Sequence, residues 1–231
     1  MRKRWQGLLA ALICLSLVAT SGEAQPDYGQ SLRIYLARHG QTDWNVEHRL
    51  QGSTDVKLND TGRQQAAQLA ELLQGIRLDA VYSSTLSRSR ETAEIVHGQT
   101  PITSLEGLGE RKLGAFQGHR VDASDSAAAV DFPRRSRDPD DALDGGESLN
   151  QFSARVHTTL AAIQAQHPSG AILIVGHKYT NQMILRALLG LSMEQALAIE
   201  QNNDELYLIE LDPGQAPRLW KLIAGTNLGE L

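Results

Sequence analysis

The sequence predicts an α/β protein of three layers, in which helices cover both faces of a mostly parallel central sheet. Two short apolar runs, residues 32–37 (LRIYLA) and 171–175 (AILIV), are typical of strands buried on both faces. Amphipathic helical patterns alternate with such runs along the chain. This alternation favours parallel strands joined by crossover helices within one domain.

The first half of the chain begins with the strand at residues 32–37. A capping box at Thr61–Gln64 then predicts the start of a helix. The apolar face of this helix comprises Ala66, Leu69, Ala70 and Leu73. A second strand is predicted at residues 79–83 (DAVYS), followed by a helix over about residues 86–97 that a glycine ends. Residues 102–105 are a candidate for a further strand.

An irregular stretch follows in the middle of the chain. Residues 119–146 are rich in Ala, Ser, Asp, Arg, Pro and Gly, and we expect a short helix plus a mobile excursion there. A second capping box at Ser148–Gln151 predicts the next helix. Its apolar face comprises Leu149, Phe152, Val156, Leu160 and Ile163.

The carboxyl-terminal part completes the pattern. The strand at residues 171–175 leads into a helix that runs through Leu189 and ends at Gly190. Two last strands are predicted at residues 205–211 and 218–223, joined around the turn Asp212-Pro213-Gly214.

The amino-terminal segment has the features of a signal peptide. Three basic residues precede the apolar run at residues 7–19, which is too short for a comfortable membrane span. Small residues follow, so we expect residues 1–24 to be removed and residues 25–231 to form the domain. An uncleaved anchor is the alternative. Lipidation of Cys14 is not expected, because the residue before a lipoprotein cysteine is normally small and here it is an isoleucine.

Composition limits the function classes. Removal of residues 1–24 leaves 207 residues with a formal net charge of −7 at pH 7, and it removes the only cysteine. A net negative body argues against a nucleic-acid partner, so an anion site must be a local pocket of positive charge. A chain without thiols forms no disulfide and no cysteine-ligated metal site. It is compatible with the periplasmic or secreted location that the signal predicts.

Two histidines stand where the apolar strands end. Arg38-His39-Gly40 follows one strand, and Gly176-His177 follows the other. Ligands of open α/β sheets bind outside the carboxyl ends of the strands. We therefore expect His39 and His177 at one site, one as a nucleophile and the other as its partner. The five remaining histidines are interpreted as surface or loop residues.

Further donors occupy the same sheet edge. Arg38 offers a planar fork, Asn45 an amide, and Arg88 a full charge in the first turn of a helix. A transferred phosphoryl group needs several such donors for its three non-bridging oxygens, so the pattern predicts phosphoryl transfer without a metal ion. Alone, Arg88 or Arg90 could be a solvated helix charge and His177 a core histidine; the joint arrangement favours a site.

Six short sequence blocks follow one another along the chain. They are Leu36–Asn45 (LARHGQTDWN), Leu50–Ala66, Tyr82–Ala93 (YSSTLSRSRETA), Glu110–Gly118 (ERKLGAFQG), Gly146-Glu147-Ser148 and Val175-Gly176-His177. Together they resemble the histidine phosphatase superfamily, in the branch that contains cofactor-dependent phosphoglycerate mutase and fructose-2,6-bisphosphatase. The resemblance covers roughly residues 32–190 and implies the phosphoglycerate mutase-like fold.

The resemblance implies catalytic roles. His39 would attack phosphorus and become a phosphohistidine, while its other ring nitrogen donates to a backbone carbonyl. Glu110 would protonate the leaving alcohol and then take a proton from the attacking water. Without the resemblance, Glu110 would be interpreted as a solvated loop carboxylate paired with Arg111. The oxygens would be held by Arg38, Asn45, Arg88 and His177, with Gln51 and Gly52 at the pocket mouth.

The resemblance also implies a small phosphorylated substrate and no cofactor or metal. Only 67 positions separate Glu110 from His177, which is short for a mutase. We therefore predict a metal-independent phosphomonoesterase that acts on small phosphate esters. The alternatives are mutase-type transfer and a non-catalytic phosphate-binding protein.

Two features concern the substrate, and the first is a departure from the family pattern. Lys178 and Tyr179 replace the small residues that many relatives have after the second histidine. They would narrow or charge the pocket, unless Lys178 points to solvent. Arg134 and Arg135 resemble a basic pair of the mutases, and we interpret them as a basic lid tip or as solubilising charge. The oligomeric state stays open.

Overall fold

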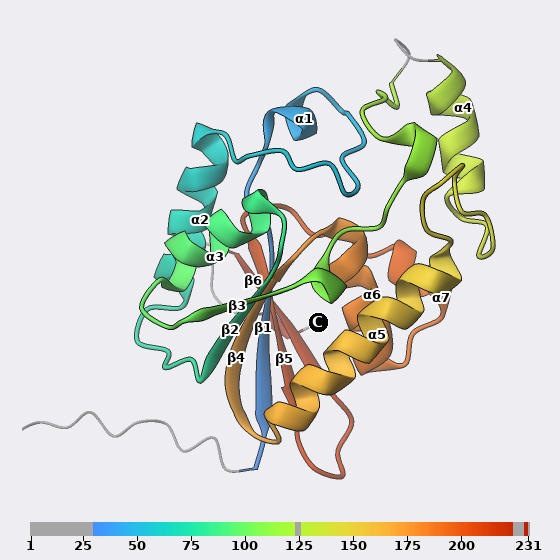
Figure 1. Ribbon diagram of the computed structural model, residues 1–231. Coiled ribbons are helices and arrows are strands. Elements are labelled where there is room, and N and C mark those ends of the chain that lie inside the picture. Colours follow the sequence, from blue (N-terminus) through green and yellow to red (C-terminus); the bar gives the residue numbers. More distant parts are fainter. Residues whose placement is uncertain (1–29, 123–125, 224–228, 231) are drawn as a thin grey trace, which may run out of the picture.

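The computed structural model describes residues 30–122, 126–223 and 229–230 (Figure 1). The predicted signal peptide over residues 1–24, including Cys14, lies outside the described residues, so its cleavage and the export of the chain stay predictions. Within the described ranges, no helix is both long and apolar enough to cross a membrane.

A mixed sheet runs through the described part of the chain in the order β3-β2-β4-β1-β5-β6-β7. The strands are β1 (Leu32–Arg38), β2 (Ala80–Ser84), β3 (Ile102–Leu105), β4 (Gly170–Gly176), β5 (Glu205–Leu211), β6 (Arg218–Ile223) and β7 (Gly229–Glu230). Strands β3, β2, β4 and β1 are parallel to one another, whereas β5, β6 and β7 continue the sheet in antiparallel pairs. The parallel part is the one that carries the two histidines.

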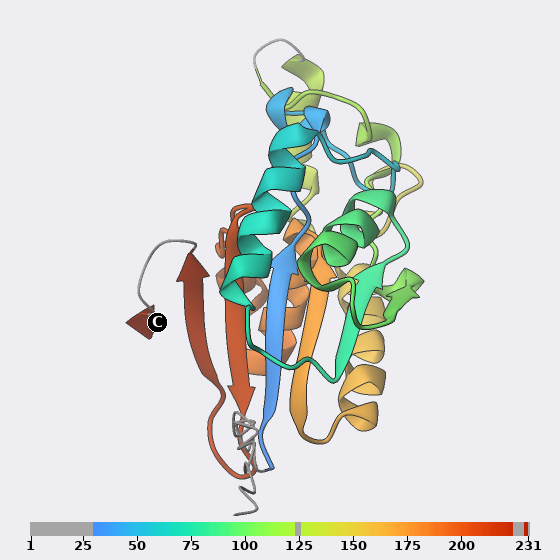
Figure 2. The same cartoon turned by 90° about the vertical axis from the view of Figure 1, so that its left-hand side faces the viewer.

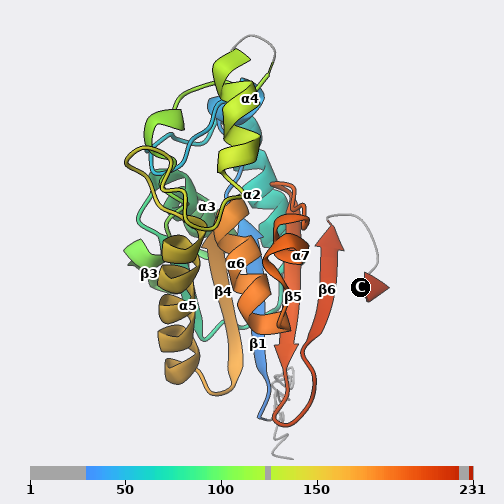
Figure 3. The same ribbon diagram turned by 90° about the vertical axis from the view of Figure 1, so that its right-hand side faces the viewer.

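Helices cover both faces of the sheet, which confirms the predicted three-layer α/β fold. They are α1 (Asp43–Val46), α2 (Asp60–Leu72), α3 (Ser87–His97), α4 (Ser126–Arg135), α5 (Leu149–Gln166), α6 (Lys178–Leu189) and α7 (Met193–Leu197), with 3-10 turns η1 (Glu106–Leu108) and η2 (Gly114–Phe116). Helices α2 and α3 lie on one face, and α5, α6 and α7 lie on the other (Figures 1 and 3). Helices α1 and α4 lie beyond the carboxyl ends of the parallel strands.

Side chains of the two central strands alternate between the two layers. Leu36 and Ile174 pack toward α5 and α6, whereas Ala37 and Val175 pack toward α2 and α3. All four are fully buried. Because successive strand residues point to opposite faces and both faces are covered, the strands need continuous apolar runs. Burial of each large aliphatic side chain contributes about 1.5–3 kcal/mol.

The pairing of β1 with β4 brings the two histidines together. The two strands are parallel and lie side by side (Figure 2), with Arg38 opposite Gly176. The residues that follow, His39 and His177, therefore leave the sheet at the same place. The backbone N–H of His39 also donates to the carbonyl of Gly176, at 3.1 Å. His39 and His177, 138 positions apart in sequence, therefore become neighbours by strand register alone.

Of the two predicted capping boxes, the structure contains one. The capping box of α5 is present as predicted, with the Ser148 and Gln151 side chains each bound to the other's backbone N–H. The predicted capping box at Thr61 is wrong. Helix α2 begins earlier, because Asn59 is its N-cap and accepts from the N–H of Gly62 at 2.9 Å. An asparagine caps better than a threonine, and here it comes first in the chain.

The first turn of α2 lies against the loop that carries the first histidine. A Cβ on Gly62 would stand 2.1 Å from the carbonyl oxygen of Gln41, and a Cβ on Gly40 would stand 2.3 Å from that of Gly62. Both contacts are with backbone, which cannot turn away. Glycine at the two positions therefore lets α2 hold the loop after β1 in place.

We predict that Gly62→Ala destabilises the protein by about 1–3 kcal/mol, because overpacking forces the loop and the helix apart. Urea unfolding measures the change. Thr61→Ala is the matched control, since Thr61 is exposed in the same turn. Surface substitutions normally change stability by less than about 0.5 kcal/mol. Equal stability of the two variants would contradict the close approach.

Candidate active site

A cavity of about 250 Å³ opens at the carboxyl ends of the parallel strands. Seven of the eight predicted site residues line it: Arg38, His39, Asn45, Gln51, Gly52, Arg88 and Glu110. The eighth, His177, is fully buried beside His39, with 5.1 Å between the ring centroids. The structure thus brings all predicted site residues to one place.

His39 is held with one ring nitrogen engaged. Its Nδ1 lies 2.8 Å from the carbonyl oxygen of Gly40. A carbonyl only accepts hydrogen bonds, so Nδ1 carries the proton and Nε2 of the neutral ring has a free lone pair. Burial, then the nearby charges of Arg88 and Arg38, hold the pKa of His39 well below 6.5. At neutral pH the ring is therefore an unprotonated nucleophile.

His177 is fixed by the neighbouring strand. Its Nε2 lies 2.7 Å from Oγ of Ser84 at the end of β2. Its Nδ1 is buried and has no hydrogen-bond partner among the described residues. Burial lowers the pKa of His177 as well, with Arg88 and His39 as further causes. A neutral ring keeps one N–H and one lone pair, so it can donate to an oxygen in the cavity while it contacts Ser84.

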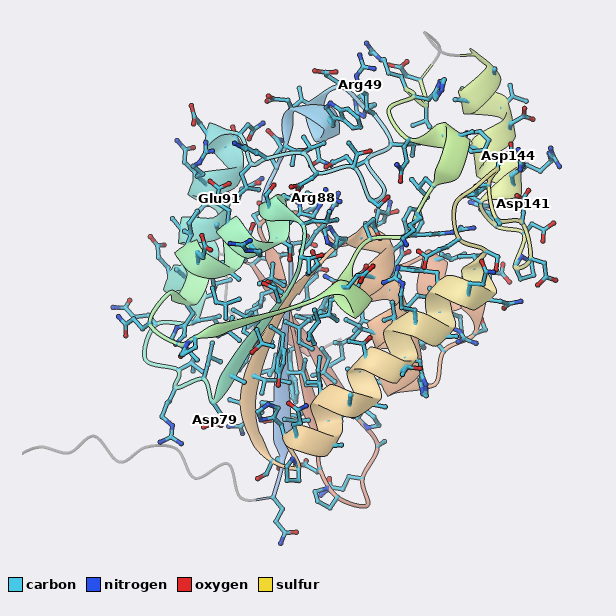
Figure 4. All side chains as sticks on the ribbon, viewed as in Figure 1. Arg49, Asp79, Arg88, Glu91, Asp141 and Asp144 are labelled. Carbon is cyan, nitrogen blue, oxygen red and sulfur yellow. The ribbon has the colours of Figure 1, made fainter. Side chains whose placement is uncertain are left out.

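Arg88 joins helix α3 to the loop that lines the cavity (Figure 4). Its two terminal nitrogens donate to the carbonyls of Thr54 and Gly52, each at 2.8 Å. Burial lowers its pKa to about 10, so the guanidinium stays charged at neutral pH. Arg90 on the same helix is exposed and lies 3.7 Å from Glu94. The structure therefore selects Arg88 for the cavity and leaves Arg90 on the surface.

Arg38 and Asn45 are oriented by groups outside the cavity. Arg38 donates from Nη1 to the carbonyl of Gln201 at 2.9 Å, and its buried Nε has no partner within the described ranges. The Asn45 side-chain oxygen accepts from the N–H and hydroxyl of Thr42, both at 3.0 Å. The amide NH2 of Asn45 is thereby left as the donor group at the cavity.

Glu110 is a buried carboxyl group, so its interpretation as a solvated loop residue is wrong. Its oxygens accept from the backbone N–H groups of Arg111, Tyr179 and Thr180 at 3.0–3.2 Å. Burial raises its pKa, while these donors and Arg88 act in the opposite direction. The Arg111 guanidinium binds carbonyls of Ser136 and other residues instead of pairing with Glu110.

The residues that were expected to affect the substrate lie in different surroundings. Lys178 pairs with Glu200 at 2.8 Å at the cavity rim, and Tyr179 lines the cavity. Arg135 binds Asp141 and Asp144, each at 2.7 Å, so it is tied into an ion-pair network next to α4 (Figure 4). This network also anchors part of the segment predicted to be mobile; its mobility stays a prediction.

Three contributions to the site were not foreseen. Ser84 contacts His177, the α6 backbone N–H groups hold Glu110, and Arg49 lines the cavity while bound to Glu47 and to the Gly118 carbonyl. Ser84 directly follows an expected strand, as the histidines do, which is a signal that could have identified it. Backbone donors and a loop arginine carry no such signal.

Comparison with known proteins agrees with this geometry. A sequence model described as "Histidine phosphatase superfamily (branch 1)" matches residues 34–222. The fold and the paired histidines define a protein that transfers phosphoryl groups. The chain belongs to branch 1 of the histidine phosphatase superfamily, and it is a histidine phosphatase.

Individual relatives include both phosphatases and mutase-like proteins. The chain is 31% identical to the "Uncharacterized phosphatase PhoE" of Bacillus subtilis, over 68% of this chain and 77% of that protein. It is 38% identical to "Phosphoglycerate mutase-like protein 4" of Arabidopsis thaliana, over 65% and 67%. The solved structure of Bacillus stearothermophilus YhfR has a TM-score of 0.72 at 31% identity, with 84% of this chain and 95% of that chain covered.

The described residues contain no group of three or more His, Cys, Asp or Glu side chains that could hold a metal ion. Arg38, Arg49 and Arg88 supply positive charge at the cavity. These cations suit a dianionic phosphate ester, and arginine forks match two phosphate oxygens at once.

We predict that Arg88→Lys weakens the binding of inorganic phosphate by roughly 10-fold or more, because the charge stays while the fork held by Gly52 and Thr54 is lost. Isothermal titration calorimetry measures the affinity. Arg90→Lys, on the exposed side of the same helix, is the matched control and should leave it unchanged. A similar loss in both variants would assign the effect to overall charge instead of the site.

Proposed function

We propose that this protein is a phosphomonoesterase that hydrolyses small phosphate esters through a phosphohistidine on His39. The observation that carries the proposal is the juxtaposition of four groups in one cavity: a neutral, tautomer-fixed His39, the buried Arg88, the half-buried Arg38 and a buried carboxyl group. A nucleophile, an oxyanion clamp and a proton donor are thereby within reach of one phosphoryl group.

The proposed reaction has two displacements. His39 Nε2 attacks phosphorus while the bond from phosphorus to the ester oxygen breaks, and protonated Glu110 gives its proton to the departing alcohol. Water then attacks phosphorus, Glu110 takes a proton from that water, and the bond to Nε2 breaks to release phosphate and neutral His39. Arg38, Arg88, Asn45 and His177 would donate to the phosphoryl oxygens in both steps, as the charges on those oxygens shift.

The state of Glu110 supports catalysis over mere binding. An ionised carboxylate in the cavity would repel a phosphate, whereas burial favours the neutral acid. A protein that only binds phosphate gains nothing from a carboxyl group there. A general acid, in contrast, must be protonated before the leaving group departs.

The surroundings of Arg135 support hydrolysis over mutase-type transfer. A mutase must hold an intermediate with two phosphoryl groups, which needs a second set of free cations. Arg135 is occupied by Asp141 and Asp144, and Arg134 is exposed, 3.6 Å from Asp131. Neither arginine of the predicted basic pair is thus poised in the catalytic cavity.

We predict that His39→Ala reduces hydrolysis of p-nitrophenyl phosphate to the uncatalysed background, because no covalent intermediate can form. After a pulse of radioactive substrate, label that the wild-type protein loses in acid and retains in alkali would identify the phosphohistidine. His157→Ala, on the exposed side of α5, is the control. Activity that survives in His39→Ala, or that excess EDTA removes, would contradict the metal-free displacement.

We predict that Glu110→Gln lowers kcat/KM for alkyl phosphates by roughly 10²–10⁴-fold and for p-nitrophenyl phosphate far less, since nitrophenolate leaves without a proton. The pH profile provides a second readout. His39 has a lowered pKa, so activity should rise with pH below 6.5; Glu110 has a raised pKa, so activity should fall with pH above 4.5.

The alkaline limb assigned to Glu110 should appear with alkyl phosphates and disappear in Glu110→Gln. Stopped assays of released phosphate across this pH range, at substrate concentrations below KM, measure both limbs. Equal slowing of alkyl and nitrophenyl esters by Glu110→Gln would remove Glu110 from the role of acid.

A further inference from the structure

A second cavity, of about 330 Å³, adjoins the catalytic cavity. The two share the lining residues Val121, Phe132, Lys178 and Tyr179, so the second begins where the first ends. The rest of its lining is Pro133, Ser136, Arg137, Gln182, Leu197 and Glu200. None of these six was assigned a role by the sequence, and none takes part in the proposed phosphoryl transfer.

We propose that the second cavity binds the alcohol part of the substrate and that Gln182 selects alcohols with a further hydroxyl group. The substrate class is then a phosphomonoester whose alcohol has an apolar body and a second, neutral hydroxyl. This inference rests on the proposed function, because it places the leaving group of that same reaction.

The side chain of Gln182 has one unused hydrogen-bonding group. It is 2% exposed, and its Nε2 donates to the carbonyls of Ile199 at 2.8 Å and Leu197 at 3.3 Å. Two carbonyl acceptors require the NH2 group on that side, so the assignment of amide oxygen and nitrogen is unambiguous. The oxygen Oε1 is buried and has no hydrogen-bond partner in the described part of the chain.

An unpaired buried amide oxygen weakens a fold unless something donates to it. Asn181, the preceding residue, also has a buried oxygen without a hydrogen-bond partner in the described ranges, but it lines neither cavity. Gln51 has the same feature and lines the catalytic cavity. Among the described residues, only Gln51 and Gln182 therefore combine an unpaired buried amide oxygen with a place on the walls of these two cavities.

The remaining walls indicate what surrounds the hydroxyl. Phe132, Tyr179, Pro133 and Leu197 present carbon surface, which favours an apolar body of the alcohol. Lys178 is neutralised by Glu200, while Arg137 is exposed and has no ion pair within the described residues. A surplus of positive charge at the rim disfavours an ammonium group. The donor that Gln182 accepts from is thus a neutral hydroxyl.

The test uses aryl phosphates whose phenolate leaving groups depart equally well. The substrates are 4-alkylphenyl phosphates with arms of two to four carbons, and their counterparts in which the arm ends in a hydroxyl group. Acetyl phosphate, whose leaving group is small, measures the catalytic cavity alone. At the best arm length, we expect the hydroxyl to raise kcat/KM by roughly 10-fold to 100-fold in the wild-type protein.

Two variants connect this preference to the cavity. Gln182→Met keeps the length of the side chain and removes its oxygen, so the hydroxyl preference should fall to about 1. The ratio of two substrates within one variant does not depend on the folded fraction. Leu197→Trp should fill the second cavity and slow all aryl substrates with arms, while acetyl phosphate is unaffected. Leu191→Trp is the matched control, since Leu191 is also half-buried but lines neither cavity.

The outcomes separate the two proposals. Absence of His39-dependent hydrolysis of acetyl phosphate would overturn the proposed function itself. Hydrolysis that depends on His39 but shows no hydroxyl preference, or a preference that persists in Gln182→Met, would overturn the subsite alone. If Gln182→Met does not fold, the comparison of Leu197→Trp with Leu191→Trp tests the subsite. Equal slowing of the aryl substrates by both variants would overturn the inference.

Discussion

The pairing of β1 with β4 is the constraint on which the site depends. One strand places a nucleophile after its last residue, the other places a partner imidazole after its own, and the register Arg38–Gly176 makes these two ends coincide. The backbone bond from His39 to Gly176 extends the pairing by one residue beyond the sheet. A slip by one residue would separate the rings, because the side chains of a strand alternate between faces.

Burial and charge act on the groups of the site in complementary ways. Burial of His39 and His177 lowers the pKa of both rings, and the nearby charges of Arg88 and Arg38 act in the same direction, so both rings stay neutral. Burial also raises the pKa of Glu110, so its carboxyl group stays protonated to a higher pH. Backbone carbonyls, not carboxylates, hold Arg88, so its full positive charge remains available to an anion. One cavity lined by cations thus holds both a neutral nucleophile and an acid.

The sequence was sufficient for the parts of the site that stand at the ends of strands. His39, Arg88 and His177 follow apolar runs or open a helix after one, so periodicity locates them. The burial of Glu110 could not be read in the same way, because it depends on α6 amides that come near only in the fold. The N-cap at Asn59 was missed because Asn59 and Thr61, two residues apart, are both good candidates for one helix start. The ion pairs of Arg135 could not be predicted, because its partners Asp141 and Asp144 lie beyond a turn.

Unpaired buried polar atoms gather where the ligand is expected. Arg38 Nε, Arg88 Nε, His177 Nδ1 and Gln51 Oε1 have no hydrogen-bond partner among the described residues, and all belong to the catalytic cavity or its wall. Each such group costs the folded state about 1–3 kcal/mol when nothing binds to it. A phosphate ester offers oxygens to the three donors, and a hydroxyl of its alcohol can serve the acceptor. A bound ligand therefore stabilises the fold by the same contacts that orient it, which couples substrate affinity to the stability of the protein.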